Sequence, residues 1–152
     1  MEIGQTVAMA VLAIGGSVLA WYHVASQVYY PTLQLRTPEG FTYSVVQDPT
    51  RERQACGAAN ARFLEPVRAR CKDCKVLYAR CFRHLDESQR VLVSQDAALG
   101  YVVLSPGMHM AISGPKAQLQ AVCERIAGDM VGRGYSSAAC IYPRGPGAPS
   151  AR

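Results

Sequence analysis

The chain has 152 residues, of which 49% are apolar and 18% are charged, and its formal net charge is +5. This apolar fraction excludes a disordered chain, and the length is enough for one modest hydrophobic core but not for two enzymatic domains. We therefore exclude a Rossmann half and a barrel, and we expect one small domain.

An apolar segment begins the chain. Residues 3–35 contain no Lys, Arg, Asp or Glu, and residues 3–20 are about as long as the roughly 20 apolar residues that cross a bilayer. Aromatic residues follow where an interfacial belt would lie: Trp21, Tyr22, Tyr29 and Tyr30. A signal peptide cleaved after Ala20 is the competing interpretation, but its charged amino-terminal region is missing, since Glu2 is the only charge. The pattern therefore favours an uncleaved transmembrane anchor over residues 1–30.

A linker and a strand–helix–strand unit follow the anchor. Pro and Gly punctuate residues 31–40, which predicts a linker. Residues 41–46 and 75–82 have the composition of strands. Between them we expect a helix over about residues 50–70, capped at its start by acidic and hydroxyl side chains and kinked or broken at Pro66. Its apolar face should consist of side chains four residues apart, namely Ala55, Ala59, Phe63 and Val67.

The second half repeats this order after an insert. Residues 85–100 are ambiguous, and we expect a short helix or turn there. Residues 101–113 predict a hairpin with a Pro-Gly turn. A helix that begins at Pro115 and a strand over residues 136–142 complete the unit, and residues 144–152 have the composition of a disordered tail.

Each half therefore contains a strand, a helix and a strand, with one Cys in the helix and another in the closing strand. The simplest architecture that accommodates these elements is α+β. We expect a ferredoxin-like split βαβ repeat over residues 41–143, with a small antiparallel sheet and both helices on one face. This fold name describes topology and implies no iron–sulfur cluster, and we expect no cofactor.

Six Cys in a chain with an export-like amino end predict disulfide bonds. They allow 15 pairings, and the repeat selects one of them. A helix that packs on its neighbouring strand can bring the Cys of the helix and the Cys of that strand to the ~5.5 Å Cα separation of a disulfide. The predicted bonds join Cys56 with Cys81, Cys71 with Cys74, and Cys123 with Cys140.

Two other uses of the cysteines are open. Cys71 and Cys74 have the CxxC spacing of thiol–disulfide oxidoreductases, but this motif ends a helix, where the dipole disfavours a thiolate. Alternatively, a cytoplasm-facing domain could use Cys71, Cys74, Cys81 and His84 as three thiolates and one imidazole around zinc. The compartment therefore decides between disulfide and metal.

The positive charge is concentrated in the first half of the domain. Residues 41–83 contain nine Lys or Arg and four Asp or Glu, whereas residues 84–152 contain six and five. We predict a basic face from seven cations: Arg62, Arg68, Arg70, Lys72, Lys75, Arg80 and Arg83. Anionic lipid, polysaccharide, a lipid-linked phosphate or an acidic protein would suit it, and a solvated surface is the alternative. We expect no nucleic acid, because the aromatic-rich signature of an RNA-binding sheet is absent.

The sequence contains no enzyme signature: there is no Gly-x-Ser-x-Gly elbow and no phosphate-binding loop, and the three His are scattered. We therefore expect a non-enzymatic accessory or adaptor protein of a bacterial cell-envelope assembly, in polysaccharide or glycoconjugate production or in secretion. It would be a single-pass protein of the inner membrane, with its domain in the periplasm and its anchor docked on an integral-membrane partner.

Overall fold

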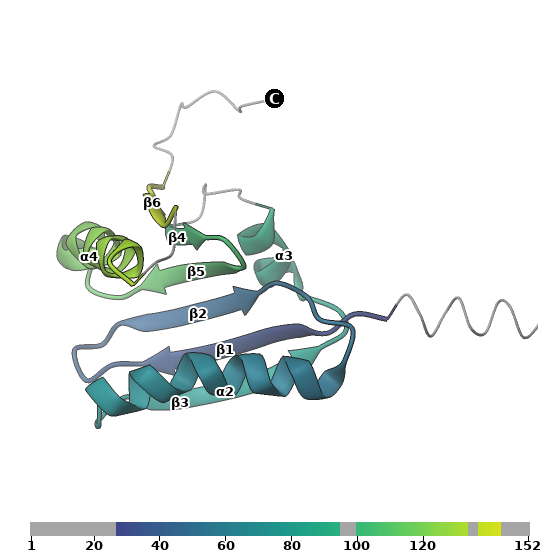
Figure 1. Ribbon diagram of the computed structural model, residues 1–152. Helices are drawn as coiled ribbons and strands as arrows, with labels where there is room; N and C mark the ends of the chain where they lie inside the picture. The colour runs from purple at the N-terminus through teal and green to yellow at the C-terminus, as the bar shows by residue number, and fades with distance from the viewer. Residues whose placement is uncertain (1–26, 95–99, 134–136, 144–152) are drawn as a thin grey trace, which may run out of the picture.

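The computed structural model describes residues 27–94, 100–133 and 137–143, which form an α+β domain around one six-stranded antiparallel sheet (Figure 1). The strands are β1 (Tyr30–Arg36), β2 (Thr42–Gln47), β3 (Lys75–Phe82), β4 (Tyr101–Ser105), β5 (Met108–Ser113) and β6 (Ala139–Ile141). The helices are α2 (Arg53–Arg70), α3 (Glu87–Val93) and α4 (Leu119–Val131), the last preceded by a 3-10 turn, η2 (Lys116–Gln118).

The strand order is β3-β1-β2-β5-β4-β6, and it divides the sheet into two similar halves. In each half a hairpin is followed by a helix and by a third strand that returns to pair with the first strand of the hairpin. The two hairpins meet in the middle of the sheet, where β2 and β5 pair from Thr42↔Ser113 to Gln47↔Met108. The repeat is therefore ββαβ.

The predicted ferredoxin-like βαβ repeat is not confirmed, because each half contains one strand more. In the first half this strand is β1, which includes residues 31–36 of the linker predicted over residues 31–40. Pro31 predicts a boundary between elements, but it is the second residue of the strand, near the strand end where proline is tolerated, and it is fully buried. In the second half the predicted hairpin forms, and both of its strands belong to the repeat.

The predicted anchor lies mostly outside the described residues, which exclude residues 1–26. Within the part of the chain that the structure describes, no helix combines the length and the apolar character needed to span a bilayer. Two of the four predicted belt aromatics are described and belong to the domain: Tyr29 forms an isolated bridge with Thr50, and Tyr30 begins β1. The predicted tail over residues 144–152 also lies outside the described residues.

The core lies between one face of the sheet and helices α2 and α4. It combines alternate residues of the strands, such as Leu33, Val45 and Val103, with Leu64 of α2 and Val122 of α4. A smaller cluster on the other face packs α3 against β2 and β4. Both long helices therefore cover the same face, as the sequence predicted, and the insert contributes a third helix to the opposite face.

Helix α3 confirms the short helix predicted within residues 85–100. Asp86 and Gln89 form a reciprocal cap: the Gln89 N–H donates to Asp86 Oδ1 at 2.8 Å, and the Asp86 N–H donates to Gln89 Oε1 at 3.0 Å. Residues 95–99 lie outside the described residues.

Helix α2 differs from the prediction at its start, and the break that Pro66 allowed does not occur. Its N-cap is Glu52, without a side-chain cap, because the Thr50 hydroxyl instead donates to the Tyr29 and Glu52 carbonyl oxygens. Pro66 neither breaks nor ends the helix, which continues to Arg70. Because Pro66 has no backbone N–H, α2 lacks one helical hydrogen bond. The contacts of α2 with the sheet offset this loss.

A buried amide ties α2 to three strands. The Asn60 side chain is 5% exposed; its Nδ2 donates to the carbonyl oxygens of Arg80 at 3.0 Å and Thr32 at 3.4 Å, and its Oδ1 accepts from Gln47 Nε2 at 3.1 Å. These bonds connect the helix to β3, β1 and β2. Buried polar groups are retained when they are satisfied in this way.

Three disulfide bonds complete the domain, and they join the pairs that the repeat predicted: Cys56–Cys81, Cys71–Cys74 and Cys123–Cys140. The first and the third occupy equivalent places in the two halves, since each joins a long helix to the strand that follows it. Cys56 and Cys123 are fully buried.

Candidate binding groove

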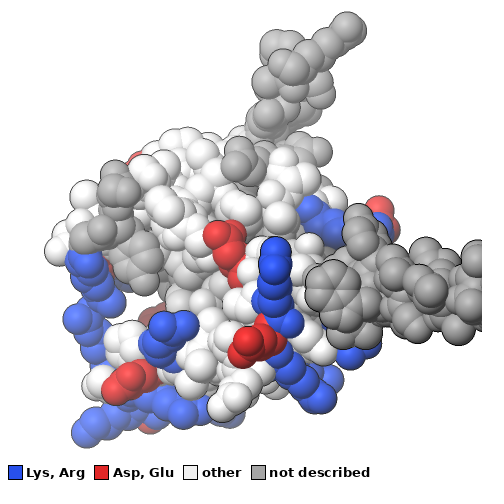
Figure 2. All heavy atoms as spheres, turned by 45° about the vertical axis from the view of Figure 1, so that its right-hand side comes forward, with Lys and Arg blue, Asp and Glu red and all other residues white. Residues whose placement is uncertain are grey.

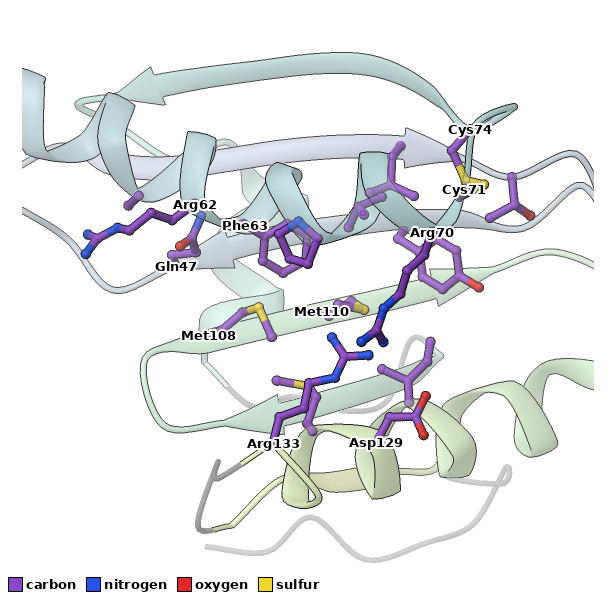
Figure 3. Close-up of a pocket in the computed structure, with 18 residues that line it drawn as sticks. Gln47, Arg62, Phe63, Arg70, Cys71, Cys74, Met108, Met110, Asp129 and Arg133 are labelled. Carbon is purple, nitrogen blue, oxygen red and sulfur yellow. A yellow bond between two sulfur atoms is a disulfide. The ribbon is translucent and has the colours of Figure 1, made fainter.

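A groove lies between α2 and α4, on the helix-covered face of the sheet (Figure 3). The two helices cover the outer strands, and the groove lies over the central strands β2 and β5, where the two halves meet. Its cavity volume is about 580 Å³, within the range of about 300–1,000 Å³ typical of small-molecule sites. We call it the central groove.

The floor of the central groove is mainly apolar, with Gln47 of β2 as its polar residue. Tyr43 of β2 and Met108 and Met110 of β5 point toward the helices, because alternate residues of a strand share one face. Leu35 of β1 and Met130 of α4 extend this surface. Burial raises the pKa of the Tyr43 phenol, an effect that the nearby Arg125 partly opposes. The floor is therefore a poorly hydrated surface with flexible methionine side chains.

The wall on the α2 side contains the apolar stripe that the sequence predicted on one face of the helix. Ala59, Phe63 and Val67 are only partly buried and line the groove. The residues of α2 that are buried against the sheet lie one position further along, namely Cys56, Asn60 and Leu64. The predicted stripe is partly buried, and Phe63 and Val67 also pack against the core. Helix α2 therefore has two adjacent stripes, one that is buried against the sheet and one that is partly buried and borders the groove.

The rim of the groove is predominantly cationic. Its charged lining residues are Arg62 and Arg70 of α2, with Asp129 and Arg133 of α4 and its C-terminal turn. Figure 3 shows the guanidinium groups of Arg70 and Arg133 pointing toward one another from opposite walls. Two like charges that converge over an apolar floor favour an anion between them, and the planar guanidinium fork suits phosphate or carboxylate oxygens.

The structure divides the predicted basic face. Arg62 and Arg70 lie on the central groove, whereas the other five cations do not line it: Arg68, Lys72, Lys75, Arg80 and Arg83. Arg83 contacts Tyr29 instead, with a hydrogen bond of 3.0 Å to the phenol oxygen and its guanidinium carbon 5.3 Å from the ring centroid. Figure 2 shows many of the Lys and Arg side chains in the lower half of the view, where a few carboxylates are interspersed.

The structure places the cysteines of the two alternative uses in disulfide bonds. The zinc hypothesis needs Cys71, Cys74 and Cys81 as thiolates, but they belong to two different disulfides. His84 is exposed after β3, and residues 27–94, 100–133 and 137–143 hold no group of three or more His, Cys, Asp or Glu that could bind a metal ion. The Cys71–Cys74 bond lies at one end of the groove and follows the C-terminus of α2, the unfavourable end for a reactive thiolate.

Sequence reasoning missed the residues that α4 and β5 contribute to the groove. The predicted site residues include neither Asp129 and Arg133 nor Met108 and Met110. The alternation of Met108 and Met110 was a usable signal, because it places both side chains on one face of a strand. That this face borders the same groove as α2 follows only from the pairing of β2 with β5, which joins the two halves.

Comparison with known proteins yields no relative: no family model, no curated protein and no solved structure matches the chain. The functional argument therefore depends on the geometry of the central groove.

Proposed function

We propose that this protein is a non-enzymatic, membrane-anchored accessory protein of the bacterial cell envelope, whose central groove binds an acidic ligand or partner outside the cytoplasm. The observation that carries the proposal is the groove itself, where three arginines and one aspartate surround an apolar floor between the two repeat helices. Cavities that combine an apolar lining with a few convergent polar groups are the usual form of a binding site.

The three disulfides support a location outside the cytoplasm. Such bonds persist in oxidising compartments such as the periplasm and are rare in the reducing cytosol. The apolar residues 3–20 supply the anchor in this proposal, since they match the length of a bilayer span. An anchor of this kind would keep the domain beside integral-membrane partners of a polysaccharide, glycoconjugate or secretion assembly.

Matched charge reversals test the groove as the site. One variant, Arg62→Glu/Arg70→Glu, reverses two cations that line the groove, and the control, Arg68→Glu/Lys72→Glu, reverses two exposed cations that do not. The full chain in phosphatidylcholine nanodiscs would be titrated with dextran sulfate, decyl phosphate and a polyglutamate peptide. We expect at least one of these anions to bind, and the groove variant to weaken it about tenfold for each of the two reversed arginines that the anion contacts.

The control should change the affinity less than about threefold, because exposed charges outside the site act only through screened, long-range attraction. Equal losses in the two variants would show that the chain attracts anions through its net charge alone. That result, or no binding of any of the three anions, would contradict the proposed site.

A further inference from the structure

We infer that the ligand of the central groove is a single-chain lipid phosphate, with one hydrocarbon chain on the floor and its phosphate between Arg70 and Arg133. This inference rests on the proposed function and names the chemistry of the acidic ligand. Its source is the membrane beside which the proposed anchor holds the domain.

The floor fits a hydrocarbon chain. Three of the chain's five methionines, Met108, Met110 and Met130, line the groove, and none of the charged lining residues comes from the central strands β2 and β5. Methionine side chains are flexible and polarisable, so they repack around an alkyl chain without demanding one shape. A polysaccharide would leave these side chains without apolar contacts, because its surface carries hydroxyl groups.

The rim fits one compact anionic head. Arg70 reaches the groove from the end of α2, and Arg133 reaches it from the turn after α4, so a phosphate between them would accept hydrogen bonds from both walls. Asp129, one helical turn before Arg133, adds a negative charge to the same wall. This carboxylate would repel a polyanion with many charges, whereas a single phosphate can avoid it.

The size of the groove also favours a lipid over a protein partner. A volume of about 580 Å³ holds a small amphiphile, whereas stable protein interfaces bury about 1,200–2,000 Å² of surface and place many residues in contact. An acidic peptide would need partners for its backbone, and the lining offers mainly apolar and cationic side chains.

Photoaffinity labelling tests the inference on the full chain in phosphatidylcholine nanodiscs. The probe is decyl phosphate with a diazirine near the end of its chain, and the matched probe is decyl maltoside with the same diazirine and an uncharged head. Labelled peptides are located by mass spectrometry. We expect the phosphate probe to modify the peptides that contain Tyr43, Phe63 and Met110 at a yield at least tenfold above that of the maltoside probe.

Two variants and a chain-length series sharpen the test. Arg70→Gln should lower groove labelling about tenfold or more, because one charge-assisted contact is lost, whereas Arg68→Gln on the same helix should change it less than twofold. Competition by unlabelled alkyl phosphates should improve up to about fourfold for each added methylene that enters the floor. Inorganic phosphate should compete poorly.

The outcomes separate the two proposals. Equal groove labelling by both probes, or equal competition by inorganic phosphate, would overturn the lipid phosphate inference. Absence of groove labelling, while dextran sulfate or polyglutamate still binds through Arg62 and Arg70, would overturn the inference and leave the proposed function standing. Loss of every groove-dependent signal would overturn both.

Discussion

Removal of the disulfides one at a time should destabilise the domain in the order of the loops that they close. The bonds close loops with sequence separations of 25 for Cys56–Cys81, 17 for Cys123–Cys140 and 3 for Cys71–Cys74. In the chain-entropy treatment these loops correspond to about 3.5, about 3.1 and about 1.6 kcal/mol of stability at 25 °C. The two equivalent bonds of the repeat should therefore cost nearly the same, and the short one about half as much.

The assay is pulse proteolysis in urea on the full chain in a neutral detergent, with each pair replaced by Ala. Alanine is preferable to serine because Cys56 and Cys123 are fully buried, and a serine hydroxyl there would need a partner. With a urea dependence of about 1.5 kcal/mol per molar, the midpoint should fall by about 2 M for either long-loop bond and by about 1 M for Cys71–Cys74.

If the variant without Cys71–Cys74 lost as much stability as the variant without Cys56–Cys81, the loop-entropy reasoning would be refuted. A large difference between the two equivalent bonds would refute the claim that the halves of the repeat are stabilised alike.

Three further changes have expected outcomes. Asn60→Ala should cost about 2–3 kcal/mol in the free energy of unfolding, measured by urea titration, because it removes the three hydrogen bonds by which a buried amide connects α2 to three strands; a cost below about 0.5 kcal/mol would contradict this. Gly114→Ala should lower the free energy of unfolding by about 2–3 kcal/mol, since the φ of Gly114 is +153° and the new Cβ would lie 2.7 Å from the Phe41 ring. Gly40→Ala should lower it by only about 1 kcal/mol, since Gly40 has φ +88° but open space around the new Cβ. Burial lowers the pKa of His109 more than Asp48 raises it, so the unfolded chain binds this proton more readily. The free energy of unfolding should therefore be highest above about pH 7 and should fall as the pH drops through the unfolded-state pKa of about 6.5. The variant His109→Gln should lose this part of the pH dependence. An unchanged dependence of stability on pH in this variant would refute the argument.

Much of the architecture could be predicted because its signals are local. The helices, the hairpin with its Pro-Gly turn and the cysteine positions all follow from short patterns, and the repeat of cysteines then predicted the disulfide pairs. The α+β class and the shared face of α2 and α4 followed from the same reasoning.

The ββαβ topology could not be predicted in this way. Strand β1 contains Pro31 and follows an apolar segment, so its local pattern resembles a linker, and only its pairing with both β2 and β3 makes it a strand. The same limit applies to the groove. The spacing of Ala59, Phe63 and Val67 predicts an apolar face, but only the burial of Cys56 and Leu64 beside it shows that this face is partly open and borders the groove.

The most direct test of the central claim, that the groove is the binding site, uses the methionines as reporters. The five methionines of the full chain would be labelled with ¹³C at the methyl group and followed by NMR in phosphatidylcholine nanodiscs during titration with decyl phosphate. The account predicts saturable shifts at Met108, Met110 and Met130, with Met1 and Met9 as internal references, and loss of these shifts in Arg62→Glu/Arg70→Glu. Unchanged groove methyls with decyl phosphate, and equally with dextran sulfate and polyglutamate, would contradict it.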